Sequence, residues 1–126
     1  MYEKKVMISS RKGSKAEREL VRIFLESNWQ ALRIAGSGRM NLAPDIIAGT
    51  KGRLLIIECK SSKKPAIYID HIEANNVVEY AKKIGGEPWY GFRFNNKDWI
   101  FHRAEQMLNV KKVLPDSGIN FKQLIV

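Results

Sequence analysis

Residues 44–60 read Pro-Asp-Ile-Ile-Ala-Gly-Thr-Lys-Gly-Arg-Leu-Leu-Ile-Ile-Glu-Cys-Lys, and this stretch decides the fold. Apolar runs lie on either side of residues 49–52, a turn-rich break that is typical of a β-hairpin. If residues 51–52 form a two-residue turn, Thr50 pairs with Arg53. The sequence therefore predicts a hairpin with a defined register.

This register brings the charged residues of the hairpin together. Counting outward from the turn places Asp45 directly opposite Glu58, and Lys60 shares the face of Glu58 because side chains alternate along a strand. Directly opposed residues have Cβ atoms about 5 Å apart. Two carboxylates at that distance, beside a lysine, indicate a divalent-metal site. The alternative is a salt bridge in which Lys60 or another cation neutralises both carboxylates, but a single lysine leaves their charge unbalanced, which is costly to bury.

The apolar run Leu54–Ile57 predicts a strand in the middle of a sheet that is covered on both sides. Upstream of it, Ser14 and Glu17 match a helix capping box and precede an apolar pattern at helical spacing. The other expected elements are strands at 29–34, 66–69, 88–94 and 98–101, helices at 70–84 and 103–110, a polar turn at 61–65, a loop at 111–118 and a closing segment at 121–126. Together they predict an α/β fold, with a central mixed β-sheet flanked by α-helices.

Length and composition narrow the class of protein. The 126 residues fit one domain over residues 1–126, with residues 1–13 as a basic and flexible N-terminal arm. The 22 Lys and Arg against 13 Asp and Glu give a net charge of +9, which favours binding to a polyanion, nucleic acid above all. An anionic membrane surface is the weaker alternative, because no expected helix is both basic and amphipathic enough.

The location of the protein also follows from the sequence. No apolar run approaches the ~20 residues of a membrane span, and the N-terminus lacks the apolar stretch of a secretory signal. Cys59 is the one cysteine, so it forms no internal disulfide. We expect a cytoplasmic protein, associated with the nucleoid.

A Gly-Ser-Gly loop at residues 36–38 lies shortly before Asp45. Such a loop can present backbone N–H groups to a phosphate, although the P-loop pattern is absent. A mobile connection is the plainer interpretation, and the position of the loop before Asp45 favours a functional one.

Aromatic side chains alternate along the strand expected from Pro88, at Tyr90, Phe92 and Phe94. Aromatic residues at this period usually form core or a subunit interface. Base stacking is the less favoured alternative, because stacking platforms need accompanying groove chemistry.

Asp45 and Glu58-Cys59-Lys60, with a proline before the aspartate, fit the PD-(D/E)-x-K pattern of the restriction-endonuclease-like nuclease superfamily. In combination with further motifs, the chain resembles the archaeal Holliday junction resolvases. The likeness covers residues 12 to about 94 and comprises Lys12-Gly13-Ser14, Ala16–Val21, Arg33, Gly36-Ser37-Gly38, Pro44–Ala48, Ile57–Lys60, Ile67–Ile69 and Glu79–Lys83 leading to Gly85-Gly86.

The resemblance implies a restriction-endonuclease-like fold and a homodimeric endonuclease that nicks two opposing strands of a four-way DNA junction during recombination and repair. It implies Mg²⁺ as the cofactor, with Mn²⁺ as a substitute. By motif, Asp45, Glu58 and Glu17 are the metal-binding and catalytic carboxylates, and Lys60 is the catalytic lysine. Ser37 matches the family's serine in the flexible loop and is a further catalytic residue. Residues expected to bind DNA are Lys12, Arg18, Arg33, Ser37, Arg39, Lys63 and Lys64.

Two departures from the family pattern affect the expected site. Residues 40–43, after Gly38 and Arg39, are less basic than is usual in the family's loop. Glu73 stands where a glutamine is common, at the start of the middle helix. Lys60 itself has alternative roles, since it could orient or deprotonate the attacking water, or neutralise charge on the phosphorus centre.

Other functions remain open from the sequence. One is a related repair or restriction nuclease that cuts ordinary duplex, and another is a non-catalytic protein that binds junctions. No helix-turn-helix or finger is apparent, so recognition would depend on phosphate contacts and junction shape. Whether recombination or replication-clamp proteins bind the chain is left open.

Overall fold

The predicted hairpin forms the middle of a five-stranded sheet in the computed structural model, which describes residues 15–34 and 43–126. Strand β2 (Ile46–Thr50) pairs antiparallel with β3 (Arg53–Ser62), and Thr50 pairs with Arg53. Gly52 lies in the turn with a φ of 87°, a conformation that glycine adopts without strain. The predicted turn and register are therefore confirmed.

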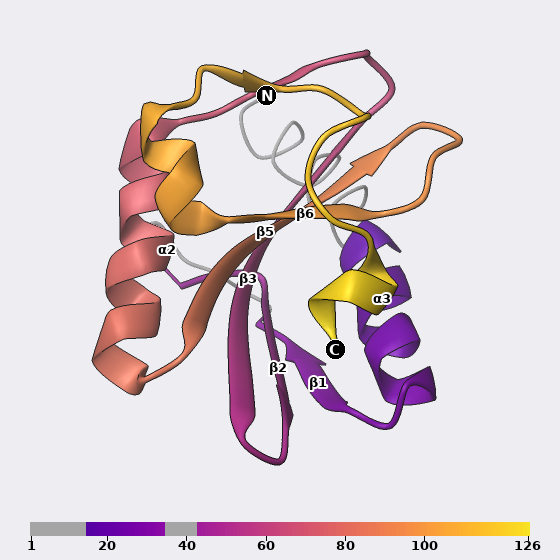
Figure 1. Cartoon of the computed structure of the whole chain (residues 1–126), viewed down its shortest axis with the longest axis vertical. Helices are drawn as coiled ribbons and strands as arrows, with labels where there is room; N and C mark the ends of the chain where they lie inside the picture. Colours follow the sequence, from indigo (N-terminus) through magenta and orange to yellow (C-terminus); the bar gives the residue numbers. More distant parts are fainter. Residues whose placement is uncertain (1–14, 35–42) are drawn as a thin grey trace, which may run out of the picture.

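The sheet is mixed, as expected, and has the strand order β1-β2-β3-β5-β6. Strand β1 (Gln30–Arg33) and β6 (Ile100–Arg103) are antiparallel edges, whereas β5 (Glu87–Phe94) runs parallel to β3. Figure 1 shows β3 and β5 side by side through the centre of the molecule. β3 extends to Ser62, so the predicted polar turn at 61–65 begins inside a strand.

Helix α2 (His71–Ile84) makes the crossover that two parallel strands require. Asp70 caps it, because its side chain accepts hydrogen bonds from the backbone N–H groups of Ile72 and Glu73. Gly85 ends the helix in the left-handed conformation, with a φ of 79°. Carboxylates in the first turn of α2 therefore have a fixed position relative to β3 and β5.

Helices cover both faces of the sheet (Figure 1). A helix over residues 15–26 and the short α3 (Phe121–Leu124) lie on one face, and α2 and the 3₁₀ helix η1 (Ala104–Asn109) lie on the other. The core of the first face contains Leu20, Phe24, Trp29, Ile46, Ala48, Leu55, Ile57, Trp89, Trp99, Phe101 and Leu124. The core of the second contains Ile67, Ala74, Val77, Tyr90, Phe92, Phe94, Ala104, Met107 and Val113.

The aromatic strand is thus internal core. Tyr90, Phe92 and Phe94 are at most 2% exposed, and the rings of Tyr90 and Phe92 stack with centroids 5.4 Å apart. They are not available for base stacking or for a subunit interface. The core interpretation of their alternation is confirmed.

A small second sheet corrects the expected loop at 111–118. Strand β7 (Lys112–Val113) lies within that range and pairs antiparallel with β4 (Ile67–Tyr68). A two-residue strand is too short to show a periodicity in the sequence. This strand forms only by pairing with β4, which lies far away in the chain.

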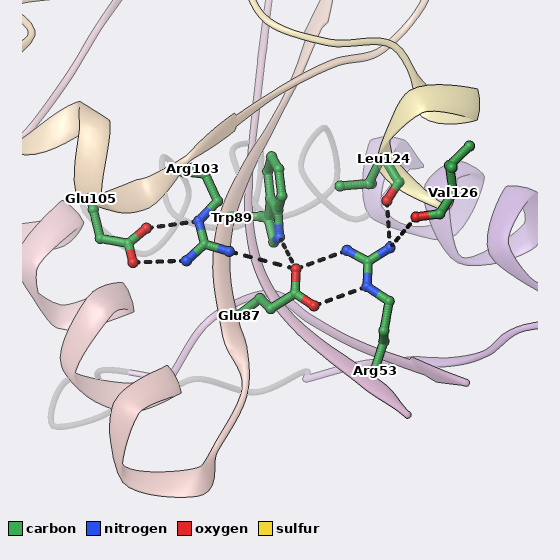
Figure 2. A network of polar contacts seen from close by, with 7 residues as sticks. All are labelled: Arg53, Glu87, Trp89, Arg103, Glu105, Leu124 and Val126. Atoms are coloured by element: carbon green, nitrogen blue, oxygen red, sulfur yellow. Dashed lines mark hydrogen bonds and ion pairs between the residues drawn. The ribbon is translucent and has the colours of Figure 1, made fainter. Parts of the chain in front are cut away.

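A polar network ties the C-terminal segment to the sheet, away from the charged end of the hairpin. Glu87 accepts hydrogen bonds from Arg53 at 2.8 and 2.9 Å and from Trp89 Nε1 at 3.1 Å. Arg103 lies on its other side at 3.6 Å, and Arg53 also donates to the carbonyl of Leu124 at 2.7 Å. Figure 2 shows Glu87 between the two arginines, so one carboxylate joins the starts of β3 and β5, the end of β6 and α3.

Candidate active site

The paired register ends one pair before the predicted pair of Asp45 and Glu58. Ile46 pairs with Ile57, and the backbone N–H of Asp45 also donates to the carbonyl of Ile57, at 3.0 Å. Two residues of one strand thus face one of the other, as in a β-bulge, which redirects a side chain. The Asp45 carboxylate accepts a hydrogen bond from the backbone N–H of Cys59 at 2.8 Å. The strand pairing therefore ends before the predicted pair, and the direct opposition of Asp45 and Glu58 stays a prediction.

Asp45 and Glu58 nevertheless interact directly at this end of the hairpin. The side chain of Glu58 is 13% exposed, and burial, followed by the charge of Asp45, raises the pKa of Glu58 to about 10. Burial also raises the pKa of Asp45, although its hydrogen bond from Cys59 lowers it. At neutral pH, the pair of carboxylates therefore shares a proton unless a cation takes its place.

Lys60 lies closer to an acidic residue of α2 than to Glu58. Its Nζ is 2.7 Å from Glu73 Oε2 and 3.9 Å from Glu58 Oε2. Tyr90 donates from its hydroxyl to the other oxygen of Glu73, at 3.0 Å. Burial opposes the charged form of Lys60, but Glu73, Glu58 and Asp45 outweigh it and raise the pKa of Lys60. Lys60 is therefore an ammonium cation at neutral pH.

Glu17 approaches the site from the helix over residues 15–26. It accepts a hydrogen bond from Arg33 Nε at 2.9 Å, and its side chain is 12% exposed. Burial and the nearby Asp45 raise the pKa of Glu17, whereas Arg33 lowers it. Glu17 thus contacts Asp45 from the face of the sheet opposite to α2. The structure brings Glu17, Asp45, Glu58 and Lys60 together at one end of the hairpin.

The carboxylates fit a divalent cation in part. Asp45 and Glu58 supply partly buried carboxylate oxygens whose mutual repulsion a cation would relieve, and hard cations such as Mg²⁺ prefer such oxygens. Among residues 15–34 and 43–126, no three acidic, His or Cys side chains form a complete metal site. Mg²⁺ commonly binds through one or two carboxylates and keeps several waters, so Asp45 and Glu58 are an adequate pair.

The expected DNA-binding residues fall into three groups. Arg33 is paired with Glu17, so it lies beside the carboxylates. Arg18 is exposed on the first helix, and Lys63 and Lys64 are exposed directly after β3. Lys12, Ser37 and Arg39 lie outside the described residues, as does Ser14 of the predicted capping box.

A groove of about 420 Å³ opens where β3 and β5 end. Its cationic residues are Lys15, Lys63 and Arg93, and Arg93 is paired with Glu19 at 2.8 Å. Glu19 also lines the groove, and the lining is completed by Ala16, Ser61, Ser62, Phe94, Asn95 and Asn96. The groove therefore continues β3 beyond Lys60 with an excess of positive charge.

Sequence reasoning missed the contacts of Glu73 and Tyr90. Glu73 was expected at the start of the middle helix and Tyr90 as a member of an alternating aromatic strand, and both expectations are confirmed. Their link to Lys60 depends on how α2 packs against β3 and β5. The departure from glutamine at residue 73 was the one signal of it in the sequence.

Comparison with known proteins gives consistent results. The archaeal Holliday junction resolvase family (Hjc) matches residues 8–125. The chain is 38% identical to a crossover junction endodeoxyribonuclease Hjc of Methanocaldococcus jannaschii, over 86% of this chain and 79% of that protein. It is 33% identical to the enzyme of the same name from Sulfolobus acidocaldarius, over 94% of this chain and 90% of that protein.

Solved structures share the fold. The Hjc Holliday junction resolvase of Archaeoglobus fulgidus superimposes with a TM-score of 0.83 at 24% identity, over 90% of this chain and all of that one. The bacterial homing endonuclease I-Ssp6803I superimposes with a TM-score of 0.59 at 12% identity, over 83% and 76% of the two chains. The predicted class, an α/β fold with a central mixed sheet like that of restriction-type nucleases, is confirmed.

Proposed function

Since the chain belongs to the archaeal Holliday junction resolvase family, and so is a crossover junction endodeoxyribonuclease, we propose that Asp45, Glu58, Lys60 and Glu17 hydrolyse its phosphodiester substrate. The observation that carries this proposal is the partly buried pair of Asp45 and Glu58 with the Lys60 ammonium beside it. The reaction is one nick in each of two opposing strands of a four-way DNA junction.

Asp45 and Glu58 would hold Mg²⁺, for which Mn²⁺ would substitute. When bound, the cation stabilises negative charge on the phosphate and lowers the pKa of water. The two residues contribute in different ways. Asp45 is held in position by the backbone N–H of Cys59, and Glu58 would release its proton to water in exchange for the cation.

Lys60 acts as a cation in this scheme. Its raised pKa supports charge stabilisation over proton abstraction, so its Nζ would donate hydrogen bonds to a phosphate oxygen or orient the attacking water. Glu17 would accept a hydrogen bond from water on the other side of Asp45. Arg33 keeps Glu17 directed toward the site.

Two symmetric nicks require two sites, so a homodimer with twofold symmetry is the natural assembly. With Tyr90, Phe92 and Phe94 buried, exposed apolar side chains near α2 are the better candidates for its interface. Ile72 is 76% exposed and Ile84 is 45% exposed, and Tyr68 of the neighbouring β4 is 71% exposed. Analytical ultracentrifugation tests this assembly, and a monomer at micromolar concentration would contradict it.

DNA would cross the catalytic end of the hairpin and continue into the groove beyond β3. The exposed residues Arg18, Lys63 and Lys64 supply positive charge there, in addition to Lys15 of the groove. Lys12, Ser37 and Arg39 remain proposed DNA contacts, with Ser37 also proposed at the reaction centre. Lys12 precedes the described residues, and Ser37 and Arg39 belong to residues 35–42, between the two described ranges.

We further propose one nuclease domain with a basic arm at residues 1–13, working in the cytoplasm on chromosomal DNA. None of the described helices is long and apolar enough to cross a membrane.

A cleavage assay tests the function. A synthetic four-way junction and its separate linear arms are incubated with the protein and Mg²⁺, and the cuts are mapped on all strands. We expect paired cuts at symmetric positions in opposing strands of the junction. Equal cleavage of the linear arms would favour a duplex nuclease, and binding without cleavage would favour a junction-binding protein.

A further inference from the structure

Glu73 and Tyr90 hold the Lys60 ammonium from elements outside the PD-(D/E)-x-K pattern. Glu73 lies in the first turn of α2, and each of its carboxylate oxygens has a separate partner. Oε2 is 2.7 Å from Lys60 Nζ, and Oε1 accepts the hydroxyl hydrogen of Tyr90 at 3.0 Å. The chain of contacts therefore runs from β5 through α2 to the catalytic end of β3.

Both supports of Glu73 are rigid. The cap residue Asp70 accepts hydrogen bonds from the backbone N–H groups of Ile72 and Glu73, which fixes the start of α2. Tyr90 is fully buried and stacked on Phe92. A lysine has a long flexible side chain that loses rotamer entropy when it is fixed, so an acceptor on a rigid support decides where its ammonium lies.

Glu73 also competes with Glu58 for Lys60. The ammonium is 2.7 Å from Glu73 and 3.9 Å from Glu58, so the tight ion pair is made with α2. Without Glu73, the nearest carboxylate for Lys60 is Glu58, and a close pair between these two would occupy an oxygen that the proposed metal needs. Glu73 therefore keeps the lysine and the glutamate of the motif apart.

The stability that such a pair contributes is small. The side chains of Lys60 and Glu73 are 33% and 28% exposed, and partly exposed ion pairs are worth little to folding. A position in the reacting site has a larger effect, because misplacing a catalytic group by about 1 Å can cost about 100-fold in rate.

We propose that Glu73 is a positioning residue which, supported by Tyr90, sets the place of the Lys60 ammonium for the phosphate. This inference rests on the proposed function and deepens it, since it adds α2 and β5 to the machinery. Glu73 acts by hydrogen-bond geometry, so an amide oxygen at the same place can replace its carboxylate.

Single-turnover cleavage of the four-way junction in Mg²⁺ tests the proposal with four variants. Glu73→Ala should cut about 10- to 100-fold more slowly with an unchanged KM for the junction. Glu73→Gln should recover to within about threefold of the wild type, and Tyr90→Phe should lose about fivefold. Glu79→Ala, which removes an exposed carboxylate of the same helix, is the matched control and should cut normally.

A double-mutant cycle separates positioning from a structural role. In a Lys60→Ala background, Glu73→Ala should reduce the residual rate by less than about threefold, because there is no ammonium left to place. Metal-free crystal structures should show Lys60 Nζ in its original place in Glu73→Gln and displaced toward Glu58 in Glu73→Ala. Thermal unfolding and junction affinity without metal should change little in either.

Three results would overturn the proposal: equal rates for Glu73→Ala and Glu79→Ala, the same large loss from Glu73→Ala with and without Lys60, or no recovery in Glu73→Gln. The proposed function fails differently, if the wild type does not cut the junction or cuts linear arms equally. In the latter case the cycle is run on the duplex that is cut, so the two failures are distinguishable.

Discussion

The carboxylate of Asp45 links the two strands of its hairpin at the end away from the turn, because its Oδ2 accepts a hydrogen bond from the backbone N–H of Cys59 at 2.8 Å. Asp45 therefore has a structural and a chemical task, and the two can be separated. In place of Asp45, an asparagine keeps one oxygen that can accept the hydrogen bond from Cys59, but it has one oxygen fewer to bind a cation. An alanine has no side-chain oxygen for either task.

We expect Asp45→Asn and Asp45→Ala to lose at least 100-fold of the cleavage rate and to bind the junction as tightly as the wild type. Asp45→Ala should be less stable than Asp45→Asn by about 1 kcal/mol, because the N–H of Cys59 loses its partner. Chemical denaturation and gel-shift titration measure the two effects. Loss of junction binding in both variants would argue against a catalytic role for Asp45.

Glu87 should be the most important carboxylate for stability outside the site, because it joins Arg53, Trp89 and Arg103 (Figure 2). Glu87→Gln should lower the free energy of unfolding at pH 7 by about 1–2 kcal/mol, since it weakens charge-assisted hydrogen bonds. Glu105→Gln, which affects one exposed ion pair with Arg103, is the matched control and should cost less.

The same network sets a pH dependence. The hydrogen bond from Arg53 lowers the pKa of Glu87 in the folded protein, so its contribution is present above the unfolded pKa and is lost as pH falls through the folded one. The stability gap between the wild type and Glu87→Gln should therefore shrink from pH 6 to pH 3. A gap that widens in acid would contradict the network.

Cations of the groove should bind the DNA backbone. Lys15→Ala and Lys63→Ala should each weaken junction binding and reduce the slope of log affinity against log salt by about 1, through counterion release. Lys51→Ala, in the turn at the far end of the hairpin, is the control and should leave the slope unchanged. Fluorescence anisotropy over a range of salt concentrations measures this slope. Equal slopes in all three variants would exclude the groove as the path of the DNA.

Local patterns predicted the parts of this molecule that local chemistry determines. The turn before Arg53 determined the register of β2 and β3 because a two-residue loop permits one pairing. The helix predicted over residues 70–84 agrees with α2, whose ends are determined locally because Asp70 and Gly85 satisfy backbone groups of that helix. The register, and with it the approach of Asp45 to Glu58, could be predicted by counting.

What the sequence did not disclose depends on contacts between distant elements. The bulge at Asp45 arises where β2 begins, and counting along a regular strand cannot anticipate it. The approach of Glu73 to Lys60 depends on the packing of α2 over the sheet, and Tyr90 reads as an ordinary apolar residue of a strand. The site residues of the motif could therefore be predicted from the sequence, whereas the residues that hold them in place could not.

Glu58 should make the metal-free protein less stable as pH rises. Burial and Asp45 raise the pKa of Glu58 to about 10, so between the unfolded pKa, near 4.5, and about 10 the folded state holds a proton that the unfolded state has released. Stability therefore falls with rising pH across that window. Glu58→Gln, which resembles the protonated acid, lacks this dependence and should be the more stable protein at pH 8 in EDTA.

Urea denaturation in EDTA at pH 5, 7 and 9 measures this, with Glu79→Gln as the control for a glutamate at an exposed position. Mg²⁺ should recover stability in the wild type at pH 8 and recover much less in Glu58→Gln, because binding to the folded state alone shifts the unfolding equilibrium. A wild type whose stability rises from pH 5 to pH 9 in EDTA would show that Glu58 is ionised without a metal. The partly buried carboxylates of Asp45 and Glu58 would then need a different cation beside them, and that cation would be the nearby Lys60 ammonium.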